Sequence, residues 1–221
     1  ISGWVGSDLT AGILATGIHR REELSLLIDI GTNGEIIIGN KEWLISCSAS
    51  AGPALEGASV SCGMRAESGA VEKVTAENGV ISYSTIGKDG PVGICGSGII
   101  DLIGVLLSEN IIDRSGKIVA DVPDRIALED GIKRFILVPK SSGNREVFLT
   151  ETDMENVITA KAAIFAALKI LLERLELRFR DIMKFYLAGA FGNYLNIRNA
   201  IAIGLIPNIR EDRIVFVGNT A

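Results

Sequence analysis

An acidic residue inside an apolar segment is the first feature of this sequence that could do chemistry. The segment reads LLIDIGTNGEIIIG over 26–39, and its apolar halves around a Gly-rich centre indicate two buried strands joined by a tight turn. Asp29 lies within the first strand. An ionised carboxylate there costs free energy unless a cation or hydrogen-bond donors accompany it. Asp29 therefore either accepts hydrogen bonds from its own turn or binds a cation.

Three glycine-rich segments could bring exposed backbone close to a phosphate. Glycine lets the main chain turn with positive φ and approach a ligand, and backbone N–H groups at turns and helix N-termini bind phosphate. None of the segments is a Walker A loop or a Rossmann Gly-x-Gly-x-x-Gly turn, and each alone can equally be an ordinary turn. Together they favour a nucleotide, with Asp29 binding Mg²⁺ directly or through water. The residues expected at the nucleotide are Gly31, Thr32, Asn33 and Gly34, then Gly96, Ser97 and Gly98, then Gly189, Ala190, Phe191 and Gly192.

The strands that must position these residues are predicted from apolar runs and turn residues. Strands at 24–30, 35–39 and 42–47 are joined by very short turns, so they must be antiparallel neighbours. Alternating residues around Asn78-Gly79 predict a hairpin. Further strands are expected within 111–150, at "FYLAGAFGN" and at 213–217.

Helices are expected between and after these strands. The longest is predicted over 152–175, where Thr152 and Glu155 have the spacing of a capping box. Shorter helices are expected at 8–18, 97–107 and 197–203. Antiparallel strands followed by alternating helices and strands predict an α/β fold with a mixed sheet and flanking helices.

Composition and charge exclude several classes of protein. The net charge is 22 − 27 = −5 without a basic block, which argues against nucleic acid as the main partner. Charges interrupt every long apolar run, so no membrane-spanning helix is expected. The three cysteines contain no Cys-x-x-Cys pair, which argues against a zinc or iron–sulfur site made by this chain alone. Unpaired thiols favour a cytoplasmic protein.

Four stretches in this order resemble one protein family. They are "LLIDIGTNGEIIIG", "CSASAGPALEGASVSCGM", "GICGSGIIDLI" and "YLAGAFGNYLN". They look like the C-terminal ATPase domain of the reductive activators of corrinoid proteins, within the superfamily of acetate and sugar kinases, heat-shock chaperones and actin. The resemblance extends over nearly the whole chain, from "SGWVGSDLTAGILAT" to "FVGNTA".

The resemblance implies a ribonuclease-H-like fold of two lobes with ATP and Mg²⁺ in the cleft between them. Asp29–Gly34 matches the family's second phosphate motif, with Asp29 as catalytic residue and metal ligand, and the segment 188–193 matches its adenosine motif. Family members use ATP to drive electron transfer to an inactive Co(II) corrinoid and so restore Co(I) for methyl transfer. Glu56, in "GPALEGA", is expected to orient the attacking water, and a plain helix-end carboxylate is the competing interpretation.

The resemblance also implies partners and a domain organisation. The partners would be a corrinoid protein and an electron donor such as a ferredoxin or flavoprotein, with a homodimer left open. Residues 1–23 are expected to be a helix from a truncated first lobe, and residues 24–221 to form the ATPase lobe, with a β-rich insertion near 111–150. The family's [2Fe-2S] cluster is expected only in an N-terminal domain absent from this chain, which would then be inactive alone.

Two other functions stay open at this point. One keeps the superfamily and changes the chemistry to a small-molecule kinase or an activator of another reductase. The other is a docking module that binds a corrinoid protein and uses nucleotide only as a conformational ligand.

Overall fold

The computed structural model describes residues 6–141, 145–189 and 195–220. The described residues form two compact units. Unit 1 comprises 6–52, 163–189 and 206–220, and unit 2 comprises 53–141, 145–162 and 195–205.

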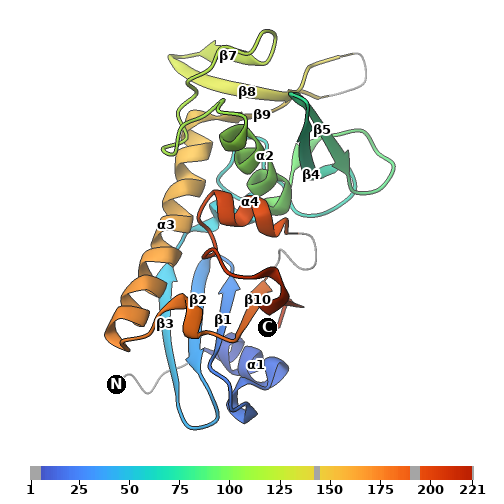
Figure 1. Ribbon diagram of the computed structural model, residues 1–221. Helices are drawn as coiled ribbons and strands as arrows, with labels where there is room; N and C mark the ends of the chain where they lie inside the picture. Colours follow the sequence, from blue (N-terminus) through green and yellow to red (C-terminus); the bar gives the residue numbers. More distant parts are fainter. Residues whose placement is uncertain (1–5, 142–144, 190–194, 221) are drawn as a thin grey trace. The chain divides into compact units, whose positions relative to one another are not determined.

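Unit 1 is built on a five-stranded mixed sheet with the order β11-β10-β1-β2-β3 (Figure 1). Strand β1 is antiparallel to β2 and parallel to β10, while β2 is antiparallel to β3 and β10 is parallel to β11. The predicted mixed α/β architecture is confirmed. The elements of this unit are α1 (Ser7–Thr16), η1 (Ile18–Arg20), β1 (Ser25–Ile30), β2 (Asn33–Gly39), β3 (Leu44–Ser50), η3 (Phe179–Asp181), β10 (Lys184–Gly189), η5 (Glu211–Arg213) and β11 (Ile214–Gly218).

The centre of this sheet is buried on both faces, which explains its continuous apolar runs. Leu26, Leu27 and Ile28 are all almost fully buried although neighbouring side chains point to opposite faces. On one face, Leu27 and Ile37 pack with Leu9 of α1 in a common core cluster. Each such side chain contributes roughly 1.5–3 kcal/mol through burial, so the strand position of Asp29 is held firmly.

Unit 2 contains two small sheets and the helices packed around them. One sheet has the order β5-β4-β6 and the other the order β7-β8-β9 (Figure 1). Asn78 and Gly79 both have positive φ in the β4–β5 turn, as the predicted Asn-Gly hairpin requires. The elements are η2 (Pro53–Glu56), β4 (Ala70–Glu77), β5 (Val80–Thr85), β6 (Gly93–Ile94), α2 (Gly96–Ser108), β7 (Ile126–Glu129), β8 (Ile132–Val138), β9 (Val147–Thr150) and α4 (Ile197–Ala202).

A buried carboxylate connects three of these elements. Asp101 of α2 is fully buried, and its two oxygens accept hydrogen bonds from the Asn199 side chain of α4 (2.8 Å) and the Val74 N–H of β4 (3.2 Å). Burial raises the pKa of Asp101, and these two hydrogen bonds partly oppose the rise. Asp101 therefore fixes α4 and β4 against α2.

The longest helix, α3 (Glu151–Arg174), begins at a capping box that differs from the predicted one. The N–H of Asp153 donates to the Thr150 hydroxyl (3.0 Å), and the N–H of Thr150 donates to the Asp153 carboxylate (2.9 Å). The predicted box of Thr152 and Glu155 was wrong. Asp153 takes this role instead. Its side chain is buried, and its carboxylate also accepts hydrogen bonds from the N–H and hydroxyl of Ser61.

Among the described residues, none of the helices has both the length and the apolar character needed to cross a membrane. The three cysteines, Cys47, Cys62 and Cys95, are all free thiols.

Candidate functional site

The carboxyl ends of three parallel strands meet at one edge of the sheet in unit 1. In the sheet register Asp29 pairs with Ala188, Ile30 with Gly189, and Ala188 with Gly218. Strands β1, β10 and β11 therefore end together. This edge is where ligands bind in open α/β sheets.

Asp29 is partly buried at this edge and accepts its hydrogen bond from a distant part of the chain. The Thr220 hydroxyl donates to Oδ2 of Asp29 (3.4 Å). Burial raises the pKa of Asp29, the negative charge of Asp8 raises it further, and the Thr220 hydrogen bond opposes the rise. The Asp29 carboxylate thus accepts a hydrogen bond from a residue 191 positions away in the chain.

Two further carboxylates lie near Asp29. Glu35 is directly opposite it in the β1–β2 pair, and the pKa of Glu35 is raised by burial and then by the charges of Asp8 and Asp29. Asp8 stands in the first turn of α1. Within the described residues, none of the three forms an ion pair with Lys, Arg or His. Negative charge is therefore concentrated here, and no cation of the described residues pairs with it.

The turn after β1 is held by its own backbone and by packing. The N–H of Gly31 donates to the Asn33 carbonyl (2.9 Å), and the N–H of Gly52 donates to the Thr32 carbonyl (2.8 Å). A Cβ on Gly34 would lie 2.5 Å from Cγ1 of Ile164 in α3. Close packing against Ile164 thus accounts for glycine at position 34, and the expected positive φ is absent at both Gly31 and Gly34.

Gly189 brings the end of β10 against Asp29. Its φ is +111°, and a Cβ there would lie 2.2 Å from the Ile30 carbonyl oxygen and 3.1 Å from Oδ1 of Asp29. Only glycine fits this approach, so the third glycine segment starts beside the first. The expected contacts Ala190, Phe191 and Gly192 lie outside the described residues.

The second glycine segment belongs to unit 2, where packing explains two of its residues. The Ser97 hydroxyl donates to the Glu72 carbonyl (3.0 Å), and a Cβ on Gly98 would lie 2.3 Å from the Val71 carbonyl oxygen. These contacts seat the first turn of α2 on β4. Gly96 is the first residue of α2. Glu56, the predicted water-orienting residue, ends η2 in the same unit, whereas Asp29 belongs to unit 1.

Sequence reasoning did not single out Asp8, Glu35 or Thr220 as site residues. Asp8 was assigned only to a helix start, and Glu35 only to a strand. Thr220 follows the last strand, and "GNT" after an apolar strand is a weak signal that a polar side chain reaches the sheet edge. Their proximity depends on contacts across up to 191 positions of the chain.

The side chains at this edge fit a magnesium ion that takes most of its ligands from outside the protein. No group of three or more His, Cys, Asp or Glu side chains in the described part of the chain is arranged to hold a metal. Mg²⁺ is usually bound by one or two carboxylates together with waters and substrate phosphates. Asp29, a partly buried carboxylate that forms no ion pair among the described residues, meets that requirement.

Comparisons with known proteins agree with this architecture. A solved structure of a "Reductive activator for corrinoid,iron-sulfur protein" superposes with a TM-score of 0.93 at 46% identity, covering 100% of this chain and 36% of that one. The "Corrinoid activation enzyme RamQ" of Eubacterium limosum is 38% identical over 100% of this chain and 39% of its own length. The "[Co(II) methylated amine-specific corrinoid protein] reductase" of Methanosarcina barkeri is 28% identical over 98% of this chain and 41% of its own length.

The chain thus spans about two fifths of the length of these curated relatives. The family model described as the C-terminal domain of RACo, the ASKHA domain, matches residues 23–221. The family resemblance inferred from the four sequence motifs is confirmed. This chain belongs to the family of C-terminal ASKHA domains of RACo.

Proposed function

We propose that this chain is the ATP-binding and ATP-hydrolysing domain of a reductive activator of a corrinoid protein. The observation that supports nucleotide binding best is Asp29, a carboxylate at the common end of β1 and β10 that forms no ion pair with the described residues. The corrinoid part of the proposal is supported by the names of the relatives, all of which act on or activate corrinoid proteins.

In this proposal each predicted site residue has a defined task. Asp29 holds Mg²⁺, directly or through water, and Thr220 keeps the carboxylate oriented by its hydrogen bond. The backbone of Gly31–Gly34 and the glycine at 189 let the phosphates approach the sheet, with Gly96–Gly98 at the start of α2 as a second anion contact. The bound metal ion supplies charge neutralisation for the phosphates. Glu56 orients the attacking water.

Nucleotide can assist an uphill electron transfer only if it binds two states of the protein differently. We propose that ATP changes how far the domain closes. This motion changes the contact with the corrinoid protein and so repositions its resting cobalt site. The electron donor would be a ferredoxin or flavoprotein, the [2Fe-2S] cluster would lie outside this chain, and the protein would act in the cytoplasm.

The test is reduction of a Co(II) corrinoid protein by the full-length protein that carries this sequence. The absorbance of the Co(II) and Co(I) states is followed with a low-potential reductant, with and without ATP. We expect ATP to accelerate reduction, Asp29→Asn to abolish the acceleration, and Asp130→Asn to preserve it. Asp130 is a fair control because it is exposed in the β7–β8 turn with φ 50°, a conformation that Asn also tolerates. Reduction that ATP never accelerates would refute the proposal.

A further inference from the structure

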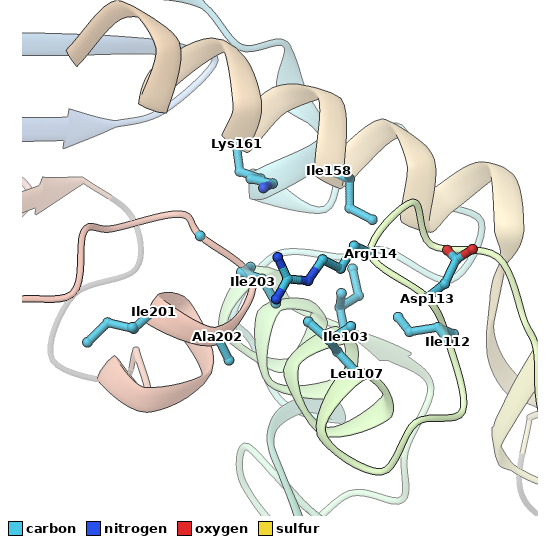
Figure 2. A pocket seen from close by; sticks show the side chains of 11 residues that line it. Ile103, Leu107, Ile112, Asp113, Arg114, Ile158, Lys161, Ile201, Ala202 and Ile203 are labelled. Atoms are coloured by element: carbon cyan, nitrogen blue, oxygen red, sulfur yellow. The ribbon is translucent and has the colours of Figure 1, made fainter. Parts of the chain in front are cut away.

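A pocket in unit 2 carries two positive side chains that the proposed function does not use. It lies between α2, α3, α4 and the loop after α2, with a volume of about 320 Å³ (Figure 2). All of its lining residues belong to unit 2. The volume lies at the lower end of the range of small-molecule sites, which are mostly apolar with a few converging polar groups.

The walls of this pocket are mostly apolar. Its apolar lining comprises Ile103 and Leu107 of α2, Ile112, Ile158 of α3, and Ile201, Ala202 and Ile203 at the end of α4. Its lining residues from α4 lie at the C-terminal end of that helix, whereas the third glycine segment precedes α4 in the chain. It also shares no residue with the sheet edge around Asp29.

Two cations point into this apolar space. Arg114 extends its guanidinium toward Ile203, and Lys161 extends from α3 into the same space (Figure 2). The Lys161 ammonium lies 3.3 Å from where a Cβ on Gly204 would be, so the missing side chain at 204 leaves room beside it. Burial lowers the pKa of Lys161, and the positive charge of Arg114 lowers it further. Two like charges therefore lie close together, Lys161 partly buried and Arg114 exposed.

No described carboxylate neutralises these two cations. Among the described residues neither Arg114 nor Lys161 forms an ion pair or a hydrogen bond. The nearby Asp113 is occupied in its own turn, where Oδ1 accepts from the Ser115 N–H (2.8 Å), the Ser115 hydroxyl (2.6 Å) and the Lys117 N–H (3.0 Å). In Figure 2 the Asp113 carboxylate points away from the Arg114 guanidinium.

The loop that carries Arg114 is fixed in place rather than loosely attached. A Cβ on Gly116 would lie 3.0 Å from Cδ1 of Ile158, so this loop packs tightly on α3. Two residues further along the chain, the N–H of Ile118 donates to the Glu151 carboxylate at the start of α3 (2.8 Å). Arg114 is therefore held near Lys161 by two anchors that follow it in the chain, although the two side chains carry the same charge.

We propose that this pocket binds a small organic phosphate, with Arg114 and Lys161 on the phosphate and the isoleucine-rich walls around its apolar part. A phosphate dianion matches the two positive charges, and an arginine guanidinium binds phosphate oxygens in a bidentate manner. Both a mononucleotide and a non-nucleotide phosphoester have this chemistry, since each joins a phosphate to an organic group. The inference does not depend on nucleotide binding at Asp29.

The test is isothermal titration of the 221-residue chain with phenyl phosphate, AMP and inorganic phosphate. We expect phenyl phosphate or AMP to bind more tightly than inorganic phosphate, because only they can fill the apolar walls. A double variant, Arg114→Gln with Lys161→Gln, should weaken this binding by about tenfold or more, as expected for the loss of charge-assisted hydrogen bonds. The matched control, Lys88→Gln with Lys169→Gln, removes the same charge from exposed positions and should change nothing. Thermal melts verify that both double variants are folded.

The outcomes separate this site from the proposed nucleotide site. Asp29→Asn should leave phenyl phosphate binding intact, and a saturating concentration of phenyl phosphate should not displace MgATP from the full-length protein. Competition between the two ligands would overturn the inference, because the pocket would then be part of the ATP site. Absence of heat for all three probes, or unchanged binding by the Arg114/Lys161 variant, would also overturn it. A tighter response to AMP than to phenyl phosphate would identify a nucleotide as the source of the phosphate.

Discussion

Asp29 of β1 and Glu35 of β2 occupy directly opposite positions in an antiparallel strand pair. Like charges in this arrangement destabilise a sheet, and both carboxyl groups have a raised pKa. Asp8 adds a third negative charge to the same region. The sheet tolerates this repulsion at the edge where β1, β10 and β11 end, which is the edge where a ligand with a bound cation would relieve it.

Replacing one of the two opposed carboxylates should stabilise the protein in the absence of metal. We expect Glu35→Gln to raise the free energy of unfolding by about 0.2–1 kcal/mol at neutral pH, because it removes one cross-strand repulsion. Urea unfolding without Mg²⁺ measures the change. Glu42→Gln, at an exposed position before β3, is the control and should have little effect. A lower stability for Glu35→Gln would show that the two carboxylates do not repel each other.

Gly189 should be irreplaceable for two separate reasons. Its φ of +111° disfavours any residue with a Cβ, and the added Cβ would lie 2.2 Å from the Ile30 carbonyl oxygen. Gly131→Ala measures the cost of positive φ alone, since Gly131 has a φ of +79° with nothing within 4 Å of the added Cβ. We expect Gly131→Ala to cost about 1 kcal/mol and Gly189→Ala clearly more. Denaturant unfolding of both variants decides this, and equal losses would mean that the close approach to Ile30 relaxes freely.

Asp101 should give the protein a measurable pH dependence. Its pKa in the folded state is raised above the ordinary value of 3.8, mainly by burial. The folded protein therefore binds the Asp101 proton more tightly than the unfolded chain does. The stabilisation of the folded state by this proton is complete below pH 3.8 and is lost as the pH rises through the raised pKa.

Asp101→Asn removes this titration. It also places an amide N–H₂ group opposite one of the two donors, Asn199 or Val74, and this unsatisfied donor should lower the free energy of unfolding by about 1–3 kcal/mol. We expect the difference in unfolding free energy between wild type and Asp101→Asn to shrink as the pH rises from acid toward neutral. Urea titrations across that range measure it, with Asp130→Asn as the exposed control. A difference that grows with pH would contradict the assignment.

Much of the local structure could be predicted from the sequence. Continuous apolar runs predicted the central strands because β1 is buried on both faces, and Asn78-Gly79 predicted its hairpin because few residues other than Asn and Gly tolerate positive φ. The capping box was misplaced because two pairs with suitable spacing lie within six residues. Burial of Asp153 and its contact with Ser61 decide between them, and neither can be read from local sequence.

The candidate site could be predicted only in part. Asp29 was conspicuous because a carboxylate interrupts an apolar strand. Its neighbours Gly189 and Thr220 lie more than 150 positions away in the chain, and the parallel register that brings them there depends on the whole sheet. The three glycine segments taken together favoured phosphate turns, yet the structure gives Gly34 and Gly98 a packing reason that a sequence pattern does not distinguish from ligand contact.

The most direct test of the account is the affinity of the full-length protein for MgATP with Asp29 intact and with Asp29→Asn. Isothermal titration calorimetry measures both, and Asp130→Asn serves as a control with the same charge change at an exposed turn. If Asp29 holds the metal ion, Asp29→Asn should weaken MgATP binding by about tenfold or more, roughly 1.4 kcal/mol, while Asp130→Asn should bind as wild type. Equal affinity for MgATP in wild type and Asp29→Asn would show that the carboxylate at the end of β1 does not serve the cation.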